Sequence, residues 1–383
     1  GYQCLPANRP RLAHGGAPCQ PRHIGEFGRH RRCTCHLALK VDTVLQTDTS
    51  EMPMHWQYKA PRWLPGGNVQ TIVAAKLARR HFARPPTWRR ERWFTLDQDF
   101  IDVDWLEHQR PTDGTHVNKR PLLVLFHGLE GSVQSHYAQA FAATALQKGW
   151  DMALPHFRGC SGEINWAPRA YHSGDHEEVG WMLAQCRQRH VGPMVAVGVS
   201  LGGNALMRWA QEQGNAAAQT VQAVASVCSP IDLTASGHAI GRGFNRWVYT
   251  RMFLQTMKPR ALEKWQQFPG LFDRQALLAA KDLYAFDNVF TAPLHGFENT
   301  DDYWRRASAK PGLAHIRVPA LVLNAKNDPF IPADCLPTQS EVGPWVRLWQ
   351  PMQGGHVGFP QGAFPSHVMD MPEAVVQWLQ NPN

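Results

Sequence analysis

The sequence predicts an α/β fold in which a mostly parallel, doubly wound sheet is covered by helices on both faces. Three observations lead to this expectation. Apolar runs of strand length alternate with amphipathic segments of helix length from residue 51 onward. Several runs, such as Pro121–Phe126, are apolar throughout, as is typical of strands buried on both faces. Hydrophobic residues make up 43% of the 383 residues, which is enough for a large core.

An antiparallel hairpin is expected first, because Trp93–Leu96 and Phe100–Trp105 flank the turn Asp97-Gln98-Asp99. Strands and helices then alternate along the chain. The expected elements are strand Pro121–Phe126, helix His136–Lys148, strand Trp150–Pro155, helix His176–Gln188, strand Met194–Val199, helix Gly203–Gln213, strands Val221–Val227, Val318–Leu323 and Trp345–Trp349, and a closing helix Pro372–Gln380.

A long segment, residues 231–317, interrupts the alternation. Such an insertion in a parallel sheet usually covers the carboxyl edge of the strands, so we expect a helical lid or one wall of the substrate cleft. Its expected elements are helices Arg242–Met257 and Asp273–Tyr284 and the loop Phe286–Asn299. Three of its aromatic residues are candidates for substrate contacts: Trp247, Phe253 and Phe286.

Residues 1–50 differ from the rest of the chain. They are rich in Pro, Gly, Arg and His and have no strand or helix periodicity, so we interpret them as a disordered or artefactual extension. A single domain would then span residues 51–383, with a natural start near Met52 or Met54. The cysteines of the extension have no zinc-site spacing, and those of the domain are scattered, as is typical of reduced thiols in a cytoplasmic protein.

Charge and hydropathy exclude several classes of protein. Residues 1–50 supply half of the net charge of +8, and the remaining 333 residues are only mildly basic, so nucleic acid is not an expected partner. No apolar run is long enough for a membrane-spanning helix. Peripheral contact with a membrane surface stays open, because the insertion is rich in aromatic residues.

The strongest chemical signal is Gly198-Val199-Ser200-Leu201-Gly202. A strand is expected to run into this pentapeptide and a helix to leave it, which is the context of a nucleophile elbow. The sharp turn would expose the Ser200 hydroxyl, and side chains at the two glycines would clash across it. We therefore predict that Ser200 is a catalytic nucleophile.

A serine hydroxyl needs a base to become an effective nucleophile. Asp328 follows the strand Val318–Leu323, and His356 follows the strand Trp345–Trp349, so both are expected at the carboxyl edge of the sheet. The order Ser, acid, His is that of an elbow-type triad. Asp334 is on the same loop as Asp328 and is the alternative acid, but we favour Asp328.

The oxyanion hole is expected to consist of backbone N–H groups. One donor would be Leu201, which follows the nucleophile. The other would be Leu129, in the glycine-containing loop His127–Ser132 that follows the first parallel strand. His127 is expected to shape this loop rather than to take part in catalysis.

Several motifs together resemble the YheT-like branch of the α/β-hydrolase superfamily, whose relatives include plant embryogenesis-associated hydrolases and membrane-anchored ABHD lipases. The resemblance covers about residues 55–380 and implies an α/β-hydrolase fold with the triad Ser200, Asp328 and His356. Gln98 stands where this family usually has Gly. The motifs that carry the resemblance are Trp63–Ile72, Phe126–Ser132, Phe157–Gly162, Tyr171–Gly174, Gly198–Asn204 and Pro293–Phe297.

We therefore expect a serine hydrolase that cleaves carboxylic esters with short to medium acyl chains through an acyl-enzyme on Ser200. The expected partner is a small acyl ester, and this chemistry needs no metal or organic cofactor. A lipase acting on monoacylglycerol or phospholipid at a membrane surface is the alternative. A further alternative is a non-enzymatic interaction protein that retains the fold without the activity.

Overall fold

The computed structural model describes residues 56–108 and 119–382. The extension expected at residues 1–50 and the start expected near Met52 or Met54 lie outside the described residues.

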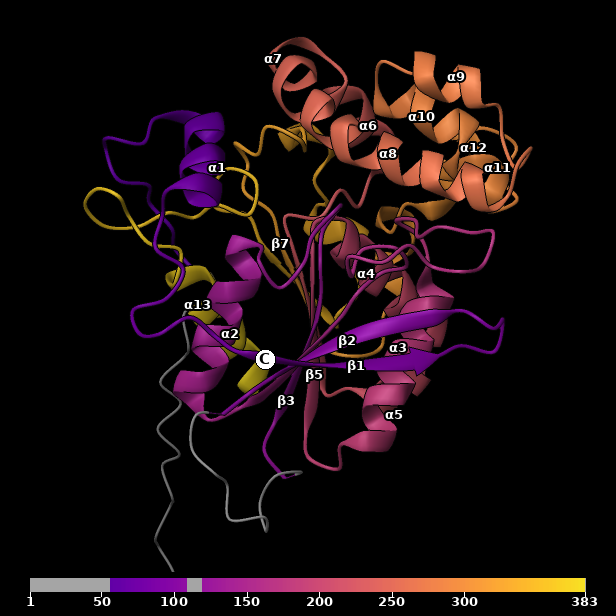
Figure 1. The fold of residues 1–383 in the computed structure, drawn as a ribbon. Helices are drawn as coiled ribbons and strands as arrows, with labels where there is room; N and C mark the ends of the chain where they lie inside the picture. Colours follow the sequence, from indigo (N-terminus) through magenta and orange to yellow (C-terminus); the bar gives the residue numbers. More distant parts are fainter. Residues whose placement is uncertain (1–55, 109–118, 383) are drawn as a thin grey trace, which may run out of the picture. The chain divides into compact units, whose positions relative to one another are not determined.

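An eight-stranded sheet forms the centre of the structure (Figure 1). The strands follow the order β1-β2-β4-β3-β5-β6-β7-β8. β3 to β8 run parallel, whereas β2 pairs antiparallel with both β1 and β4. The predicted mostly parallel sheet with an antiparallel N-terminal hairpin is confirmed. The strands are β1 (Trp88–Phe94), β2 (Phe100–Leu106), β3 (Leu122–Phe126), β4 (Asp151–Pro155), β5 (Met194–Val199), β6 (Ala223–Val227), β7 (Ala320–Leu323) and β8 (Val346–Trp349).

β1 begins at Trp88, five residues before the strand expected from the sequence. Its first half consists mainly of charged residues, which hide the alternation that marks a strand. Two of them pair across the hairpin: Arg90 Nε lies 2.8 Å from Asp104 Oδ1, and Arg92 Nε lies 2.8 Å from Asp102 Oδ1. These cross-strand ion pairs allow a polar sequence to form an edge strand.

Successive residues of the central strands belong to two separate cores. On β3, Leu123 and Leu125 pack against one set of helices, whereas Leu122, Val124 and Phe126 pack against the other. Figure 1 shows α2 and α13 on the left of the sheet and α3 and α5 on its right. The helices outside the insertion are α1 (Gly66–Lys76), α2 (His136–Lys148), α3 (His176–Arg189), α4 (Leu201–Gln213), α5 (Ala217–Thr220) and α13 (Asp370–Gln380).

The insertion is helical and lies at the top of Figure 1, beyond the carboxyl ends of the parallel strands. We call residues 231–317 the insertion throughout. Its aromatic and aliphatic residues form a core of their own around Leu277, Phe286 and Phe290. The insertion contains α6 (Leu233–Ile240), α7 (Gly243–Asn245), a π-helical turn (Arg246–Thr250), α8 (Arg251–Gln267), α9 (Arg274–Ala279), α10 (Leu283–Val289), α11 (Thr291–Leu294) and α12 (Thr300–Ala307).

Several expectations for the insertion were wrong in detail. The helix expected at Arg242–Met257 is interrupted by the π-helical turn and continues to Gln267. The helix expected at Asp273–Tyr284 is broken, because Asp282 caps a new helix by accepting a hydrogen bond from Ala285 N–H at 2.9 Å. The expected loop Phe286–Asn299 contains the end of α10 and all of α11.

Two further observations concern the described part of the chain. Its four cysteines are free thiols: Cys160, Cys186, Cys228 and Cys335. Within residues 56–108 and 119–382, no helix has both the length and the apolar character that crossing a membrane requires.

Candidate active site

The turn between β5 and α4 holds Ser200 in a strained conformation, with φ 52° and ψ −121°. The two flanking glycines are required by close backbone contacts. A Cβ atom on Gly198 would lie 2.4 Å from Gly203 Cα, and one on Gly202 would lie 2.5 Å from His127 O. The turn therefore has the geometry expected of a nucleophile elbow, in which the serine hydroxyl stands clear of the sheet.

A continuous chain of hydrogen bonds joins the three residues that were predicted as a triad. His356 Nε2 lies 3.0 Å from Ser200 Oγ, and His356 Nδ1 lies 2.9 Å from Asp328 Oδ2. The second carboxylate oxygen, Oδ1, accepts a hydrogen bond from Phe330 N–H at 2.8 Å. The side chain of Asp328 is completely buried, whereas the alternative acid, Asp334, lies exposed in a short 3₁₀ turn. The structure thus brings Asp328, and not Asp334, to His356.

The loop that carries His356 is held by the first helix, α1. Thr71 Oγ1 accepts a hydrogen bond from His356 N–H at 2.8 Å, and Gln70 Oε1 accepts one from Gly354 N–H at 2.9 Å. Gln70 Oε1 also accepts from Asn327 Nδ2 at 3.0 Å, next to the acid. In the sequence, both residues belong to the motif Trp63–Ile72 that carries the family resemblance. The structure shows that they position the loops of both Asp328 and His356.

The two predicted oxyanion donors lie on either side of Ser200. Leu201 begins α4, so its N–H group is among those that a helix leaves without an intrahelical acceptor. Gly128, which precedes Leu129, packs so closely that a Cβ atom there would lie 3.1 Å from Ser200 Cβ. The neighbouring Gly128 and Glu130 amides donate to tyrosine hydroxyls, but that of Leu129 has no acceptor among the described residues.

Hydrogen bonds around His127 fix the start of this loop. His127 Nε2 accepts from Phe157 N–H at 3.1 Å, so the ring proton is on Nδ1, which donates to Gly128 O at 2.7 Å. Burial lowers the pKa of His127 to about 3, which keeps the ring neutral. His127 therefore holds the start of the loop in place, which is the role expected from the sequence.

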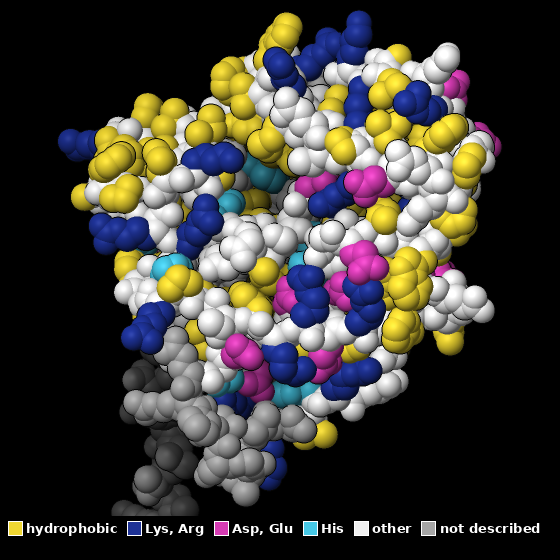
Figure 2. Space-filling view, in the orientation of Figure 1, with side chains coloured by type: hydrophobic (Ala, Val, Ile, Leu, Met, Phe, Trp, Pro, Cys, Tyr) yellow, Lys and Arg dark blue, Asp and Glu magenta, His cyan; other side chains and the backbone are white. Residues whose placement is uncertain are grey.

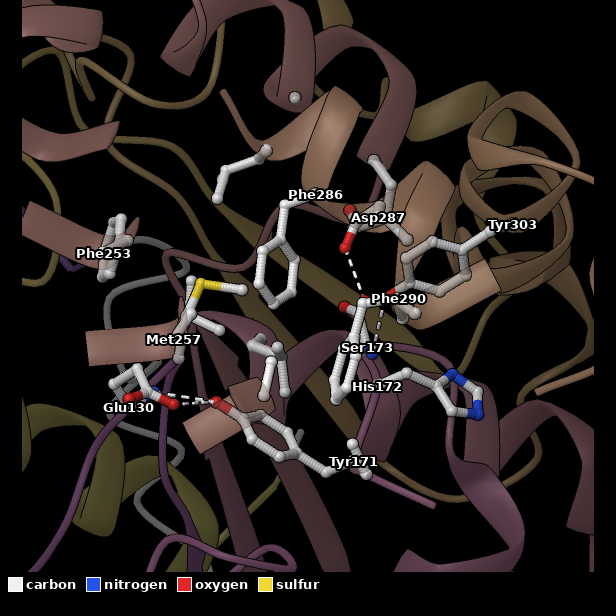
Figure 3. Close-up of a pocket in the computed structure, with 18 of the residues that line it drawn as sticks. Glu130, Tyr171, His172, Ser173, Phe253, Met257, Phe286, Asp287, Phe290 and Tyr303 are labelled. Atoms are coloured by element: carbon white, nitrogen blue, oxygen red, sulfur yellow. Dashed lines mark hydrogen bonds between the residues drawn. The ribbon is translucent and has the colours of Figure 1, made fainter. Parts of the chain in front are cut away.

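Glu130 is held in an unusual backbone conformation next to Leu129. Its φ of 57° is in the left-handed region, which costs free energy for a residue other than glycine. The Tyr171 hydroxyl accepts from Glu130 N–H at 3.1 Å and donates to Glu130 Oε1 at 2.9 Å, as Figure 3 shows. Arg260 Nη1, from α8, lies 3.1 Å from the same oxygen. These contacts fix the direction of the Leu129 amide.

A cavity with about 1180 Å³ of empty space, part of it open to solvent, lies between these loops and the insertion. Ser200, His356 and Leu129 form one side of it. The opposite side is mainly apolar and comes from the insertion (Figure 3). The principal apolar residues on that side are Leu233, Ile240, Phe253, Met257, Leu283, Phe286 and Phe290.

The three aromatic residues predicted to contact substrate have different positions. Phe253 and Phe286 line the cavity. Trp247 does not line it and is 75% exposed. It lies in the π-helical turn, whose buried residues are Tyr249 and Thr250.

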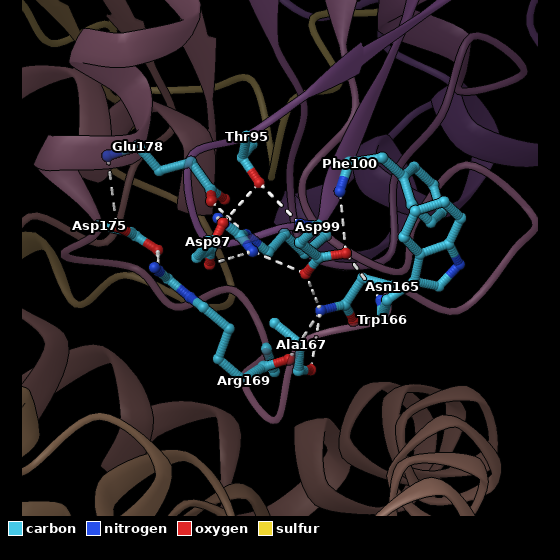
Figure 4. A network of polar contacts seen from close by, with 12 residues as sticks. Thr95, Asp97, Asp99, Phe100, Asn165, Trp166, Ala167, Arg169, Asp175 and Glu178 are labelled. Atoms are coloured by element: carbon cyan, nitrogen blue, oxygen red, sulfur yellow. Dashed lines mark hydrogen bonds and ion pairs between the residues drawn. The ribbon is translucent and has the colours of Figure 1, made fainter. Parts of the chain in front are cut away.

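A network of charges around the buried Arg158 borders the cavity and fixes the loop after β4 (Figure 4). Arg158 Nη1 lies 2.8 Å from Asp97 Oδ2 and 2.6 Å from Asp99 Oδ2, and its Nε donates to Glu178. Burial raises the pKa of Glu178 to about 7. Gln98, which replaces the glycine usual in the family, has a φ of 60° between the two aspartates. The network holds this turn in a left-handed conformation that glycine would adopt at a lower cost in free energy than Gln98 does.

A second cation on α8 joins the insertion to the same loop. Lys264 Nζ donates to Asn165 O and, at 2.9 Å, to Ala167 O. Burial lowers the pKa of Lys264 to about 8. Together with Arg260, one helical turn earlier, this lysine anchors α8 to the body of the domain. We therefore interpret α8 as a fixed wall of the cavity.

The cavity lies where an open α/β sheet normally binds its ligands. Along the chain, β3 leads to β4 on one side of it in the sheet, whereas β5 leads to β6 on the opposite side. The loops that follow β3 and β5 therefore diverge at the carboxyl edge. These two loops carry Leu129 and Ser200. The Ser200 hydroxyl, the His356 ring in contact with it, and the Leu129 and Leu201 segments therefore all border the apolar cavity.

Comparison with known proteins agrees with this architecture. A family model described as "alpha/beta hydrolase fold" matches residues 121–363, and the chain belongs to this family of hydrolases. Within it, the chain belongs to the YheT-like branch. It is 36% identical over 340 residues to "Putative esterase YheT" from Escherichia coli (strain K12), covering 88% of this chain and 96% of that protein.

More distant relatives confirm the resemblance inferred from the motifs. Human "Phospholipase ABHD3" is 26% identical over 322 residues, which cover 83% of this chain and 77% of that protein. "Embryogenesis-associated protein EMB8" from Picea glauca is 25% identical over 285 residues, which cover 72% of this chain and 62% of that protein. The relatives thus include proteins named as an esterase and as a phospholipase.

Proposed function

We propose that this protein is a serine hydrolase that cleaves carboxylic esters through an acyl-enzyme formed on Ser200. The observation that carries the proposal is the chain of hydrogen bonds from Asp328 through His356 to Ser200 at the wall of an apolar cavity. The esterase-named relative supports the reaction class.

In the acylation step, Ser200 Oγ attacks the ester carbonyl carbon while His356 Nε2 accepts the hydroxyl proton. The carbonyl oxygen becomes an oxyanion that receives hydrogen bonds from the N–H groups of Leu129 and Leu201. Asp328 keeps the ring proton on Nδ1 and stabilises the imidazolium. As the tetrahedral intermediate collapses, His356 donates its proton to the leaving alcohol.

Deacylation repeats these steps with water as the nucleophile. His356 Nε2 accepts a proton from water, which attacks the acyl-enzyme carbonyl, and the same N–H groups stabilise the second oxyanion. The proton then returns to Ser200 Oγ, and the carboxylic acid is released. Every group needed for both steps lies on a loop that follows a parallel strand or, for Leu201, at the start of the helix that follows β5.

The acyl chain would occupy the apolar side of the cavity formed by the insertion. The triad and the oxyanion donors contact only the ester group, so selection among acyl chains has to come from this wall. We propose short to medium chains as substrates and the insertion as the selecting segment. A phospholipid or monoacylglycerol substrate is the second candidate, which is favoured by the phospholipase-named relative and by the apolar lining.

Hydrolysis of a series of p-nitrophenyl acyl esters by purified protein tests the proposal. We expect activity that rises and then falls with chain length, and a decrease of about 10⁴–10⁶-fold in kcat for Ser200→Ala. Circular dichroism and thermal unfolding would show that the variant is folded. Undiminished hydrolysis by folded Ser200→Ala would refute the assignment.

A further inference from the structure

One part of the insertion is unusually basic. Residues 242–262 contain five Lys or Arg residues and no Asp or Glu. The proposed chemistry does not require this charge, because ester hydrolysis at Ser200 involves other residues. The segment comprises α7, the π-helical turn and most of α8.

An open groove runs along the outer side of this segment. Eight residues line it, and none of them is acidic: Arg246, Trp247, Arg251, Leu254, Gln255, Lys258, Pro259 and Lys281. The Arg246 and Arg251 guanidinium groups have no acidic partner among the described residues. Burial lowers the pKa of Lys258, whose ammonium group donates to Leu278 O at 2.7 Å. Four cations therefore line a groove with about 1240 Å³ of empty space, part of it open solvent, and no carboxylate is among its lining residues.

Large apolar side chains accompany these cations. Trp247 is 75% exposed, and Phe244 and Met252 are also exposed, at 54% and 42%. Figure 2 shows hydrophobic and basic side chains together at the top of the view, where α7 lies in Figure 1. We call Arg246, Trp247, Arg251, Lys258 and Lys281, with Phe244 and Met252, the basic aromatic surface.

The basic aromatic surface and the candidate active site are connected through α8. One side of this helix lines the cavity through Phe253, Met257 and Arg260. Its other side lines the groove through Arg251 and Lys258. A partner bound in the groove would therefore be separated from the cavity only by α8.

We propose that the basic aromatic surface docks the protein onto a membrane surface that contains anionic phospholipids. Clustered basic side chains are attracted to anionic headgroups, and exposed Trp and Phe side chains partition into the headgroup region. The cations without carboxylate partners would be attracted to the anionic headgroups. The side chains of Trp247, Phe244 and Met252 would partition into the headgroup region. The docked surface would hold the cavity close to a source of acyl lipids.

A nucleic acid fits these observations less well. Trp247 and Phe244 could stack on unpaired bases, but Met252 would remain exposed, because it has neither a charge for phosphates nor a ring for bases. A bilayer surface accommodates both kinds of side chain, since apolar residues enter it while cations remain at the headgroups.

Vesicle sedimentation tests this proposal without depending on hydrolysis. The full chain with Ser200→Ala would be mixed with vesicles of phosphatidylcholine alone or of equimolar phosphatidylcholine and phosphatidylserine. We expect binding only to the anionic vesicles, and weaker binding at high salt. Arg246→Gln combined with Arg251→Gln should lower the partition constant roughly thirtyfold, which corresponds to ~1 kcal/mol for each basic side chain near an anionic surface. Trp247→Ala should also lower it.

Arg305→Gln combined with Arg306→Gln is the matched control, because it removes the same charge from another helix of the insertion. This control should bind anionic vesicles as the parent does, and thermal unfolding would show that all variants are folded. Equal binding to both kinds of vesicle, or equal loss of binding in the control, would overturn the proposal. Binding to soluble heparin but not to vesicles would assign the surface to another polyanion and would also overturn it.

Discussion

Replacing Asp328 by Asn tests how His356 is oriented. In the native site, Oδ1 of Asp328 accepts from Phe330 N–H at 2.8 Å and Oδ2 faces His356 Nδ1 at 2.9 Å. An Asn side chain keeps the first hydrogen bond by placing its carbonyl oxygen at the Oδ1 position. Its NH₂ group then faces Nδ1 and can only donate. The ring proton therefore moves to Nε2, which can no longer accept the proton of Ser200.

The size of the effect follows from the two orientations that the Asn side chain can adopt. The orientation just described gives the wrong tautomer, which lowers kcat by about 10⁴-fold in serine hydrolases with this arrangement. The flipped orientation restores the tautomer but leaves Phe330 N–H facing a donor, at a cost of about 1–3 kcal/mol. It also lacks the charge that stabilises the imidazolium. We therefore expect kcat to fall by at least about 10²-fold and at most about 10⁴-fold.

The assay compares kcat for Asp328→Asn and Asp334→Asn on the same p-nitrophenyl ester. Both substitutions remove one negative charge from the same loop, but Asp334 is exposed and lies in a turn away from His356. Asp334→Asn should retain wild-type activity. If Asp334→Asn lost activity and Asp328→Asn kept it, the assignment of the acid would be refuted.

Three other predictions follow from the cavity and its surroundings. Tyr171→Phe should lower kcat about tenfold with little change in KM, because both hydrogen bonds of the Tyr171 hydroxyl to Glu130 are lost, whereas Tyr284→Phe should leave kcat unchanged. Phe253→Ala should change the acyl chain-length profile measured as kcat/KM, whereas the same profile in Trp247→Ala should match the wild type with soluble esters. Burial raises the pKa of Asp287 to about 6, so the folded state binds more protons than the unfolded state between pH ~4 and that value. Wild-type stability should fall as pH rises through this interval, and Asp287→Asn should gain up to about 3 kcal/mol relative to wild type by pH 7, measured by urea unfolding.

The sequence predicts the elements that have strong local signals. Met194–Val199 and His136–Lys148 occur with the expected bounds because their apolar patterns agree with their final burial. The elbow was predictable because the G-x-S-x-G pattern lies between a strand and a helix, although the contact that requires Gly202 is with the distant His127 O. The acid and the histidine were predictable from chain order, since each follows a strand that ends at the same edge of the sheet.

Contacts between distant parts of the chain could not be predicted in this way. The hydrogen bond from His356 N–H to Thr71 Oγ1 joins residues 285 positions apart, and no local pattern encodes it. Trp247 was expected to contact substrate because it is an aromatic residue of the insertion, but it lies in the π-helical turn and is 75% exposed. Asp232 and Asn299 cap α6 and α12, and these capping residues were the signal that could have located the two missed helices.

The reactivity of Ser200 distinguishes a catalytic serine from an incidental one, and covalent labelling measures it. The protein would be treated with a fluorophosphonate and digested, and the modified peptide identified by mass spectrometry. We expect a single adduct on Ser200, much slower labelling of His356→Ala, and no adduct in Ser200→Ala. An adduct at another residue, or labelling of His356→Ala at the wild-type rate, would contradict the proposal that His356 activates Ser200 as the nucleophile.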